Sequence, residues 1–343
     1  MKTTHTPFFA LIFILSLILT SVHAQDPHFS QPEYSPLNLN PALAGASSPF
    51  QGILLYRTQW STVTTPYLTT SASFDMRFKR NRRGRYNTLA AGIQVLHDKS
   101  GILAVTSTTV NGTVAYHALL SEVSTLSAGL SFGAGQRSLN TADGQWSSQY
   151  TPTGYNSGLS SGESFYQSIY SFLDAGAGIL YSYNNYSNTE RRSLNAGLSA
   201  FHVNRPTYSF IAEGNERLPM RYVAFFNGEF EMTDSRGSFL PGIYYQRQAV
   251  SSELYFGSYY KYHFHKGTRY TGFNRPSSLS IGLFGRMNDA AVVKFMFEYD
   301  QVSIGFAYDL NTSSLSDYSQ GQGGIEFFFR YSASDGGGFR NRE

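Results

Sequence analysis

Apolar residues alternate with polar or small residues along most of this chain, with a period of two. At 290–299, Phe295 and Phe297 occupy one set of positions, and Lys294 and Glu298 occupy the other. Successive side chains of an extended strand point to opposite faces, so the pattern predicts a strand with one apolar and one polar face. Similar runs recur to the end of the chain and predict an all-β fold.

Segments of about ten residues with this pattern are bounded by turn residues, and we predict a strand in each. Outer-membrane barrels have an even number of antiparallel strands of about 9 to 11 residues, and here the number is about 14. The pattern therefore favours a transmembrane outer-membrane β-barrel, with apolar faces toward lipid. A soluble β-sandwich adhesin alternates in the same way and stays open as an alternative. The predicted strands are 51–60, 68–78, 88–97, 104–116, 123–136, 169–183, 192–203, 218–231, 238–247, 252–263, 278–286, 290–299, 301–310 and 323–332.

Connection lengths favour one orientation of this barrel. If both ends of the barrel are periplasmic, the longest connection, Arg137–Ser168, falls outside, as expected for such barrels. The connection Phe264–Pro276 is also long but falls on the periplasmic side, so the support for this orientation is partial.

The two ends of the chain differ from the alternating part. Residues 1–24 combine Lys2, an apolar run and small residues before Gln25, which predicts a cleaved signal peptide. Residues 25–50 are rich in Pro and Asn, and we expect a plug inside the barrel or a periplasmic segment. The barrel then spans 51–332, and a Gly-rich, charged tail occupies 333–343.

The composition narrows the class of protein further. The chain has 343 residues, with 25 Tyr and 27 Phe, and only 14% of its residues are charged. This balance suits strands with a lipid-facing side better than a water-soluble domain. The net charge of +3 gives no reason to expect nucleic acid binding, and the absence of Cys excludes disulfides and thiolate metal sites.

Catalytic and metal-binding patterns are nearly absent. The sequence has no P-loop, HExxH or GxSxG motif, and glycines such as Gly133 and Gly178 fall in strands, where they let strands bend and pack. His263 and His265 could share a metal ion, but no third ligand lies near them in the sequence. We therefore expect no enzyme activity, no cofactor and no metal site.

Charged residues within the strands are expected to face the barrel interior. Lys294, Glu298, Asp309 and Arg330 occupy the polar positions of their strands. We expect the carboxylates of Asp289, Asp309 and Glu326 to be partners for Arg286 and Arg330, because buried charges need partners.

Two connections carry candidate binding residues. The connection Arg137–Ser168 contains Trp146, Tyr150 and Tyr155, which could contact a protein or a glycan, although a plain polar loop is the alternative. The basic run Lys79–Arg85 falls in a periplasmic turn. It could receive an acidic partner or an anionic envelope surface, or it could simply be solvated.

The segment that follows the predicted signal peptide supplies the remaining candidates. Its prolines restrict the backbone, and its aromatic and turn-forming residues suit an ordered plug or docking segment better than a disordered leader. The candidate residues are Asp26, Pro27, His28, Phe29, Tyr34, Asn40 and Pro41.

Blocks of sequence resemble a known family. The opening QDPHFSQ with PLNLNPALAGA resembles the N-terminal signature of the PorP/SprF family of the type IX secretion system, found in the Bacteroidota. Further blocks are similar to that family in the same order, and together they span essentially the whole chain after residue 24. They are RTQW at 57–60, SASFD at 71–75, LNAGLSAFHVNRP at 194–206, LPMRY at 218–222, LPGIYYQ at 240–246, GLFGRMNDA at 282–290, IGFAYDLNTSSL at 304–315 and GGIEFFFRY at 323–331.

This resemblance implies a non-enzymatic outer-membrane barrel that works with the type IX translocon. It further implies that the barrel binds the type B C-terminal domain of a large secreted adhesin or motility protein, and anchors it or helps its export. Gliding motility and a periplasmic lipoprotein or peptidoglycan-linked partner belong to the same expectation. The alternative is an outer-membrane transport pore for small solutes, because fourteen strands enclose a lumen.

Overall fold

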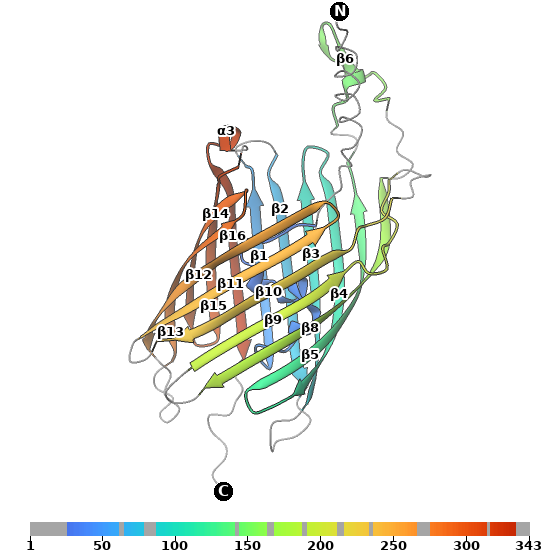
Figure 1. Cartoon of the computed structure of the whole chain (residues 1–343). Helices are drawn as coiled ribbons and strands as arrows, with labels where there is room; N and C mark the ends of the chain where they lie inside the picture. The colour runs from blue at the N-terminus through green and yellow to red at the C-terminus, as the bar shows by residue number, and fades with distance from the viewer. Residues whose placement is uncertain are drawn as a thin grey trace, which may run out of the picture.

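The described chain forms a closed barrel of antiparallel strands (Figure 1). Strands that follow each other in sequence are paired, β5 pairs with β8, and β16 pairs with β1 to close the barrel. This computed structural model describes residues 26–61, 65–78, 87–140, 144–162, 168–186, 191–210, 216–232, 236–265, 275–313 and 316–333.

Fourteen strands of the described chain make up the barrel, and each corresponds to one predicted strand. The all-β prediction and the even strand number are therefore confirmed, and the limits differ by a few residues. The barrel strands are β1 (Phe50–Gln59), β2 (Tyr67–Phe78), β3 (Thr88–Ser100), β4 (Val105–Leu119), β5 (Ser124–Ser138), β8 (Ile169–Tyr186), β9 (Arg191–Phe201), β10 (Arg221–Glu231), β11 (Gly237–Gln248), β12 (Ser251–His265), β13 (Ser277–Arg286), β14 (Ala290–Tyr299), β15 (Val302–Asn311) and β16 (Gln322–Ala333).

The alternating pattern places polar side chains inside the barrel and apolar side chains outside. In β14, Phe295 and Phe297 are 43% and 41% exposed on the outer face, whereas Lys294 is fully buried inside. A soluble sandwich would bury its apolar faces against each other. The closed barrel with an apolar outer surface therefore rules out the sandwich alternative. No helix among the described residues is long and apolar enough to cross a membrane.

The two ends of the barrel differ in their connections. At one end, which we call the terminal end, β1 begins and β16 ends (Figure 1). At the opposite end, which we call the loop end, lies the connection between β5 and β8, which carries η3 (Ser147–Gln149) and the short strands β6 (Tyr150–Thr151) and β7 (Gly154–Tyr155). The short helix α3 (Ser316–Ser319), between β15 and β16, lies at this end too.

Several sequence predictions fall on residues outside the described ranges. These are the signal peptide at 1–24, the basic run Lys79–Arg85, most of the Phe264–Pro276 connection and all but the first residue of the 333–343 tail.

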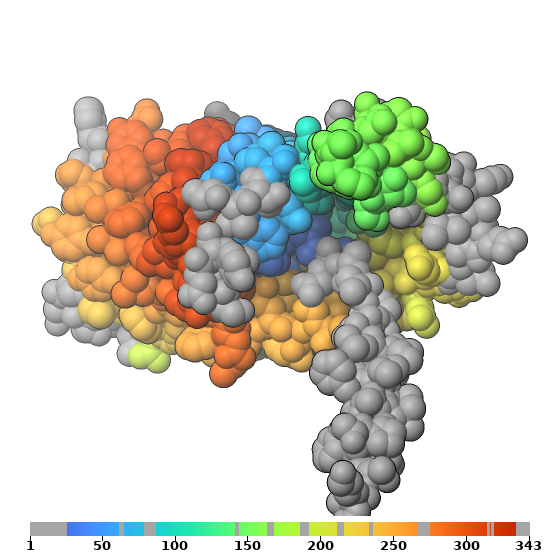
Figure 2. All heavy atoms as spheres, turned by 90° about the horizontal axis from the view of Figure 1, so that it is seen from above, coloured from blue at the N-terminus to red at the C-terminus, as the bar shows by residue number. Residues whose placement is uncertain are grey.

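Residues 26–48 lie inside the barrel, and we call them the lumenal segment. They form three short helical turns, η1 (Pro32–Tyr34), α2 (Pro36–Leu39) and η2 (Pro41–Leu43), each with Pro near its start. Pro suits the first turn of a helix because its missing N–H would have no partner there. Figure 2, seen from the loop end, shows dark blue atoms of this segment within the ring of strands. Of the two predicted locations, the segment takes the lumen.

Candidate functional site in the barrel lumen and at the loop end

The lumenal segment begins at the loop end, where Asp26 is tied to the barrel rim. The Asp26 carboxylate lies 2.6 Å from Nε2 of His202, just after β9, and 3.2 Å from Nε of Arg221, at the start of β10. The backbone N–H of Asp26 donates to the side chain of Gln248, 2.9 Å away at the end of β11. These three strand ends fix the start of the segment. Pro27 follows, half-buried.

The charges around Asp26 stabilise each other's ionised forms. Burial alone would lower the pKa of His202, but the carboxylates of Asp26 and Asp174 outweigh it and raise this pKa to about 9. Burial would likewise raise the pKa of Asp26, but His202 and Arg221 hold it below its ordinary value. His202 is therefore an imidazolium at neutral pH, held between two carboxylates.

Deeper in the lumen, the turn at Ser30 and Gln31 sits on two buried carboxylates. The N–H groups of Ser30 and Gln31 donate to Glu326, at 2.7 and 2.8 Å, and the Ser30 hydroxyl donates to Asp309 at 2.6 Å. Arg57 lies 2.8 Å from Asp309, and it also donates to the carbonyl of His28. The segment thus supplies hydrogen bonds that let these carboxylates stay buried.

The predicted charge partners around this turn are correct in part. Arg286 lies 2.9 Å from Asp289 and 3.4 Å from Asp309, as expected. Glu326 instead lies 3.9 Å from Arg57, and Arg330 pairs with Glu298 at 3.0 Å. The difference follows from pairing across the closure of the barrel, where Arg57 of β1 lies directly opposite Glu326 of β16.

The middle of the segment packs against the wall through a charge and through aromatic rings. Nζ of Lys294, a fully buried residue, lies 3.0 Å from Oε1 of Glu33. The hydroxyl of Tyr259 donates to the same oxygen at 2.6 Å. Tyr34 stacks on Phe328 with ring centroids 3.5 Å apart. Phe29 belongs to the same apolar cluster as these two rings.

Asn40 and Pro41 fit against a part of the wall that is lined by glycine. Nδ2 of Asn40 donates to the carbonyls of Ile179 and Leu198, at 2.9 and 3.1 Å. A Cβ on Gly178 would lie 2.1 Å from Oδ1 of Asn40, and one on Gly129 would lie 2.4 Å from the carbonyl carbon of Pro41. The strand glycines at 129 and 178 therefore make room for the lumenal segment, whereas the sequence had suggested only bending and packing of strands.

The last part of the segment is held near the terminal end. The N–H of Gly45 donates to Asp75 at 2.7 Å, and Nε2 of His117 lies 2.8 Å from the carbonyl of Ala44. A carbonyl only accepts, so His117 carries its proton on Nε2. Gly45 has φ of +65°, and a Cβ there would lie 2.6 Å from Cβ of Ala90, so both conformation and space require glycine.

Wall residues that hold the segment were not among the predicted site residues. For seven of them a sequence signal was present, because each is a charged or histidine residue inside one of the family-like blocks, whereas Lys294 and His117 lie outside these blocks. The seven are Arg57, Asp75, His202, Arg221, Arg286, Asp309 and Glu326. The blocks thus meet in three dimensions where the lumenal segment contacts the wall.

The aromatic candidates at the loop end lie apart from this contact. Tyr150 and Tyr155 face each other on the hairpin of β6 and β7, with ring centroids 5.4 Å apart, and they are 57% and 40% exposed. Trp146, the residue just before η3, is half-buried. Figure 1 shows the hairpin standing above the barrel rim. The structure therefore separates the predicted candidates into a lumenal group and an exposed aromatic group.

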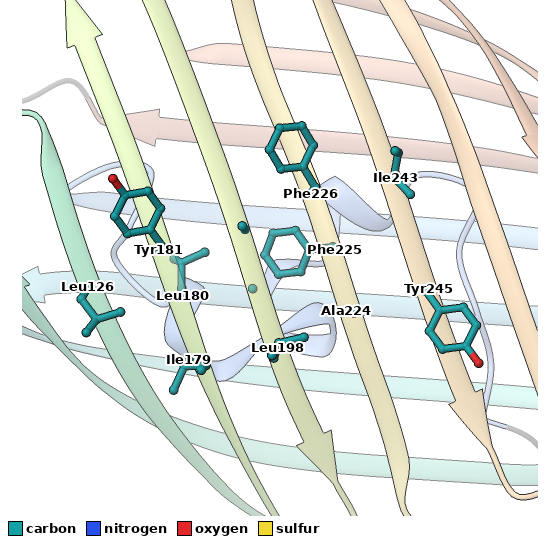
Figure 3. A pocket seen from close by; sticks show the side chains of 12 residues that line it. Leu126, Ile179, Leu180, Tyr181, Leu198, Ala224, Phe225, Phe226, Ile243 and Tyr245 are labelled. Atoms are coloured by element: carbon teal, nitrogen blue, oxygen red, sulfur yellow. The ribbon is translucent and has the colours of Figure 1, made fainter.

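The outer wall has an apolar groove of about 450 Å³ across β8 to β11. Figure 3 shows Ile179, Tyr181 and Leu198 around it, with the lumenal segment behind the strands. The small side chain of Ala196 on the outer face leaves room for this hollow, and the apolar lining suits the hydrocarbon that surrounds a membrane-spanning wall.

The two candidate metal ligands have separate partners. Nε2 of His263 lies 2.9 Å from the hydroxyl of Ser238, and Nδ1 of His265 lies 3.2 Å from that of Ser277. The strand register shifts between the two histidines. Within the described ranges, no group of three His, Asp or Glu side chains is placed to hold a metal ion.

Some solved membrane barrels are similar to this chain in shape. One is the toluene transporter TbuX of Ralstonia pickettii, with 13% identity and a TM-score of 0.48, covering 87% of this chain and 92% of that one. Another is BamA of Haemophilus ducreyi lacking POTRA domains 1–3, with 8% identity and a TM-score of 0.41, covering 83% and 70%. Likenesses this distant say nothing about function. No curated protein matches the chain.

The family comparison is more informative. The sequence profile described as "Type IX secretion system membrane protein PorP/SprF" matches residues 21–331, which include the lumenal segment and nearly the whole barrel. An outer-membrane location follows from this membership together with the barrel and its apolar outer surface. The chain belongs to the PorP/SprF family of type IX secretion system membrane proteins.

Proposed function

We propose that this barrel binds a large secreted adhesin or motility protein through its type B C-terminal domain, and anchors it or helps its export at the cell surface. Membership of the PorP/SprF family supports a role beside the type IX translocon. The filled lumen supports this role most strongly. Residues 26–48 occupy it, and wall charges such as Lys294 and Asp309 are engaged by this segment.

Because the lumen is filled, we expect partners to bind to the outer surfaces of the barrel and not inside it. A solute pore needs an open path whose polar groups are free to meet water or solute. Here Arg57 and Glu326 are each 1% exposed, and both contact the lumenal segment. This arrangement favours a docking protein over the alternative of a pore for small solutes.

The hairpin at the loop end supplies a surface suited to docking. The long connections of an outer-membrane barrel face outward, so this end is the external one. Tyr150 and Tyr155 present amphipathic rings with few rotatable bonds, and such side chains carry much of the energy in protein interfaces. We propose that they contact the client, with the half-buried Trp146 supporting the hairpin.

Client capture from detergent extracts tests the proposal. The tagged barrel is purified from cells that express the full type IX system, and co-purified proteins are identified by mass spectrometry. We expect a large secreted protein, retained through its C-terminal domain and lost from the cell surface when the barrel is deleted. The proposal would be contradicted if the barrel retained no client and the secreted proteins were still displayed normally on the surface of the deletion strain.

A matched pair of variants locates the docking surface. Tyr150→Ala with Tyr155→Ala should reduce client retention about tenfold or more, since buried interface aromatics often contribute over 1 kcal/mol each. The control is Val250→Ala, which removes a 78% exposed apolar side chain from the β11–β12 turn at the same end. Equal retention in both variants would exclude the hairpin as the docking surface.

Further partners and gliding motility are part of the same proposal. The basic run Lys79–Arg85 would meet a periplasmic lipoprotein or a peptidoglycan-linked protein. Replacing its Lys and Arg residues with Gln should release such a partner in cross-linking experiments while client retention persists. A client that proves to be a motility protein would connect the barrel to gliding.

A further inference from the structure

A polar cavity of about 240 Å³ opens at the loop end, on the side of the mouth formed by β12 to β16 and β1. His28 of the lumenal segment contributes to its lining. Its other lining residues include Trp60, Glu253, Arg286, Met287, Asp289 and Asp309. The contacts of the lumenal segment leave this cavity unfilled, so it is a distinct feature of the external mouth.

Carboxylates outnumber cations among the described residues that line the cavity. Asp309 already receives Arg57 and the Ser30 hydroxyl. Glu253 and Asp289 both share Arg286, which lies 3.6 Å from the former and 2.9 Å from the latter. One guanidinium between two carboxylates leaves negative charge on the cavity side. A cationic ligand group would balance it.

One wall of the cavity is apolar. The indole of Trp60 lies at the end of β1, braced edge-on against Tyr67 with ring centroids 4.8 Å apart. Met287, which follows β13, also lines the cavity and is 61% exposed. The aliphatic stem of a long basic side chain packs well on such surfaces, and an indole face also attracts a cation. The wall and the carboxylates therefore complement two parts of one side chain.

Two buried nitrogen atoms of the lining have no hydrogen-bond partner among the described residues. One is Nε of Arg286, on a residue that is only 5% exposed, where the nearest carboxylate oxygen, Oε1 of Glu253, lies 3.6 Å away and beyond hydrogen-bond distance. The other is Nε2 of His28. An unpaired buried donor is costly, and the Nε–H of Arg286 suits a carbonyl oxygen. The unused Nε–H of Arg286 therefore suits a ligand that offers an acceptor as well as a cation.

We propose that this cavity receives a lysine or arginine side chain presented by an extracellular polypeptide, with Glu253 and Asp289 binding its charge. The proposal deepens the proposed function and rests on it where the polypeptide is the secreted client. The ligand's main-chain carbonyl accepts from Arg286, and its side-chain stem packs against Trp60. Gln59, which also lines the cavity, offers a side-chain amide for a further main-chain contact.

The chain has only two Trp residues, which allows a direct measurement of the cavity. In a Trp146→Phe variant, Trp60 is the remaining indole and its fluorescence reports on the cavity. The purified barrel in non-ionic detergent is titrated with acetyl-Gly-Gly-Lys-Gly-Gly-amide. The comparison peptide carries norleucine in place of lysine, which keeps the stem and removes the charge. We expect a saturable fluorescence change with the lysine peptide. Its dissociation constant should be lower than that of the norleucine peptide by a factor of about ten or more.

Variants that remove charge from the cavity provide a second test. Glu253→Gln with Asp289→Asn should raise the dissociation constant of the lysine peptide about tenfold or more. Asp300→Asn is the matched control, because this partly exposed carboxylate lies in the β14–β15 turn at the terminal end and pairs with Arg275 at 3.5 Å. It should bind the peptide as the parent does. Equal binding of both peptides, or unchanged binding in the double variant, would overturn the proposal.

Client retention separates this inference from the proposed function. If the unmutated barrel retains no client but still prefers the lysine peptide, the proposed function fails and the basic side-chain site stands. If the barrel retains its client but does not distinguish lysine from norleucine, this inference fails alone. Reduced retention in the Glu253→Gln and Asp289→Asn variant supports both.

Discussion

The Asp26 carboxylate lies 2.6 Å from Nε2 of His202, although 176 residues separate them in the chain. Nδ1 of the same ring lies 2.9 Å from Asp174 at the other side. His202 has φ of +56°, an uncommon conformation for a residue with a side chain. This contact holds the start of the segment at the loop end of the barrel, opposite the end where β1 begins.

The Asp26–His202 pair predicts how stability depends on pH. The pKa of His202 is raised to about 9, above its unfolded value, so its contribution is complete below about pH 6.5 and is lost as the pH rises through 9. The pKa of Asp26 is lowered, so its contribution is present above about pH 4 and is lost only in stronger acid. Urea unfolding should therefore show up to about 3 kcal/mol less stability at pH 10 than at pH 6.

Histidine variants test this assignment. His202→Asn should remove most of the loss between pH 6 and pH 10. His97→Asn is the control, because Nδ1 of His97 lies 2.8 Å from the Thr108 hydroxyl and is not held by a carboxylate in any described ion pair. Identical pH profiles for the parent and His202→Asn would contradict the assignment.

The buried pair of Lys294 and Glu33 predicts a non-additive double variant. Lys294→Met leaves Glu33 without its cation, and Glu33→Gln leaves Lys294 without its carboxylate, so each should cost about 3 to 5 kcal/mol. The double variant removes both charges of this pair, so its loss of stability should be clearly smaller than the sum of the losses in the two single variants. Urea midpoints in detergent provide the measurement, and strictly additive costs would show that the two groups do not interact.

The glycine-lined wall predicts that one methyl group can loosen the lumenal segment. Gly129→Ala places a Cβ 2.4 Å from backbone atoms of Pro41 and Ala42, which no side-chain rotation can relieve. Overpacking of this kind costs about 1 to 3 kcal/mol, so amide exchange in the segment should speed up about ten- to a hundredfold. Exchange is followed by mass spectrometry on peptides that cover residues 36–46.

The matched control is Gly285→Ala in β13, because a Cβ there meets nothing within 4 Å. Its lumenal segment should exchange at the parent rate. Parent-like exchange in Gly129→Ala would mean that the segment does not rest on this part of the wall.

The strands could be predicted from the sequence because each one carries its own signal. Phe295 and Phe297 alternate with Lys294 and Glu298 without reference to any other part of the chain. The same pattern indicated that Lys294 points inward, and it does. Local alternation, however, carries no information about which inward charges meet.

The lumenal contacts were beyond such a prediction because they join distant residues. Ser30 meets Asp309 across 279 positions, and Tyr259 meets Glu33 across 226. Glu326 was expected beside Arg330 or Arg286, but closure of the barrel places it opposite Arg57. The pairing of β1 with β16 depends on closure of the complete barrel, so it cannot be predicted from the pattern of any single strand.

The lumenal segment closes this barrel, and planar-bilayer conductance measures that closure. The intact protein is compared with a variant that lacks residues 26–44, after both are shown to migrate as folded barrels before heating. We predict no steady channel from the intact protein and a stable ohmic conductance from the deletion variant. A steady conductance of similar size in the intact protein would show that the lumenal segment does not close the barrel, and would favour the solute pore.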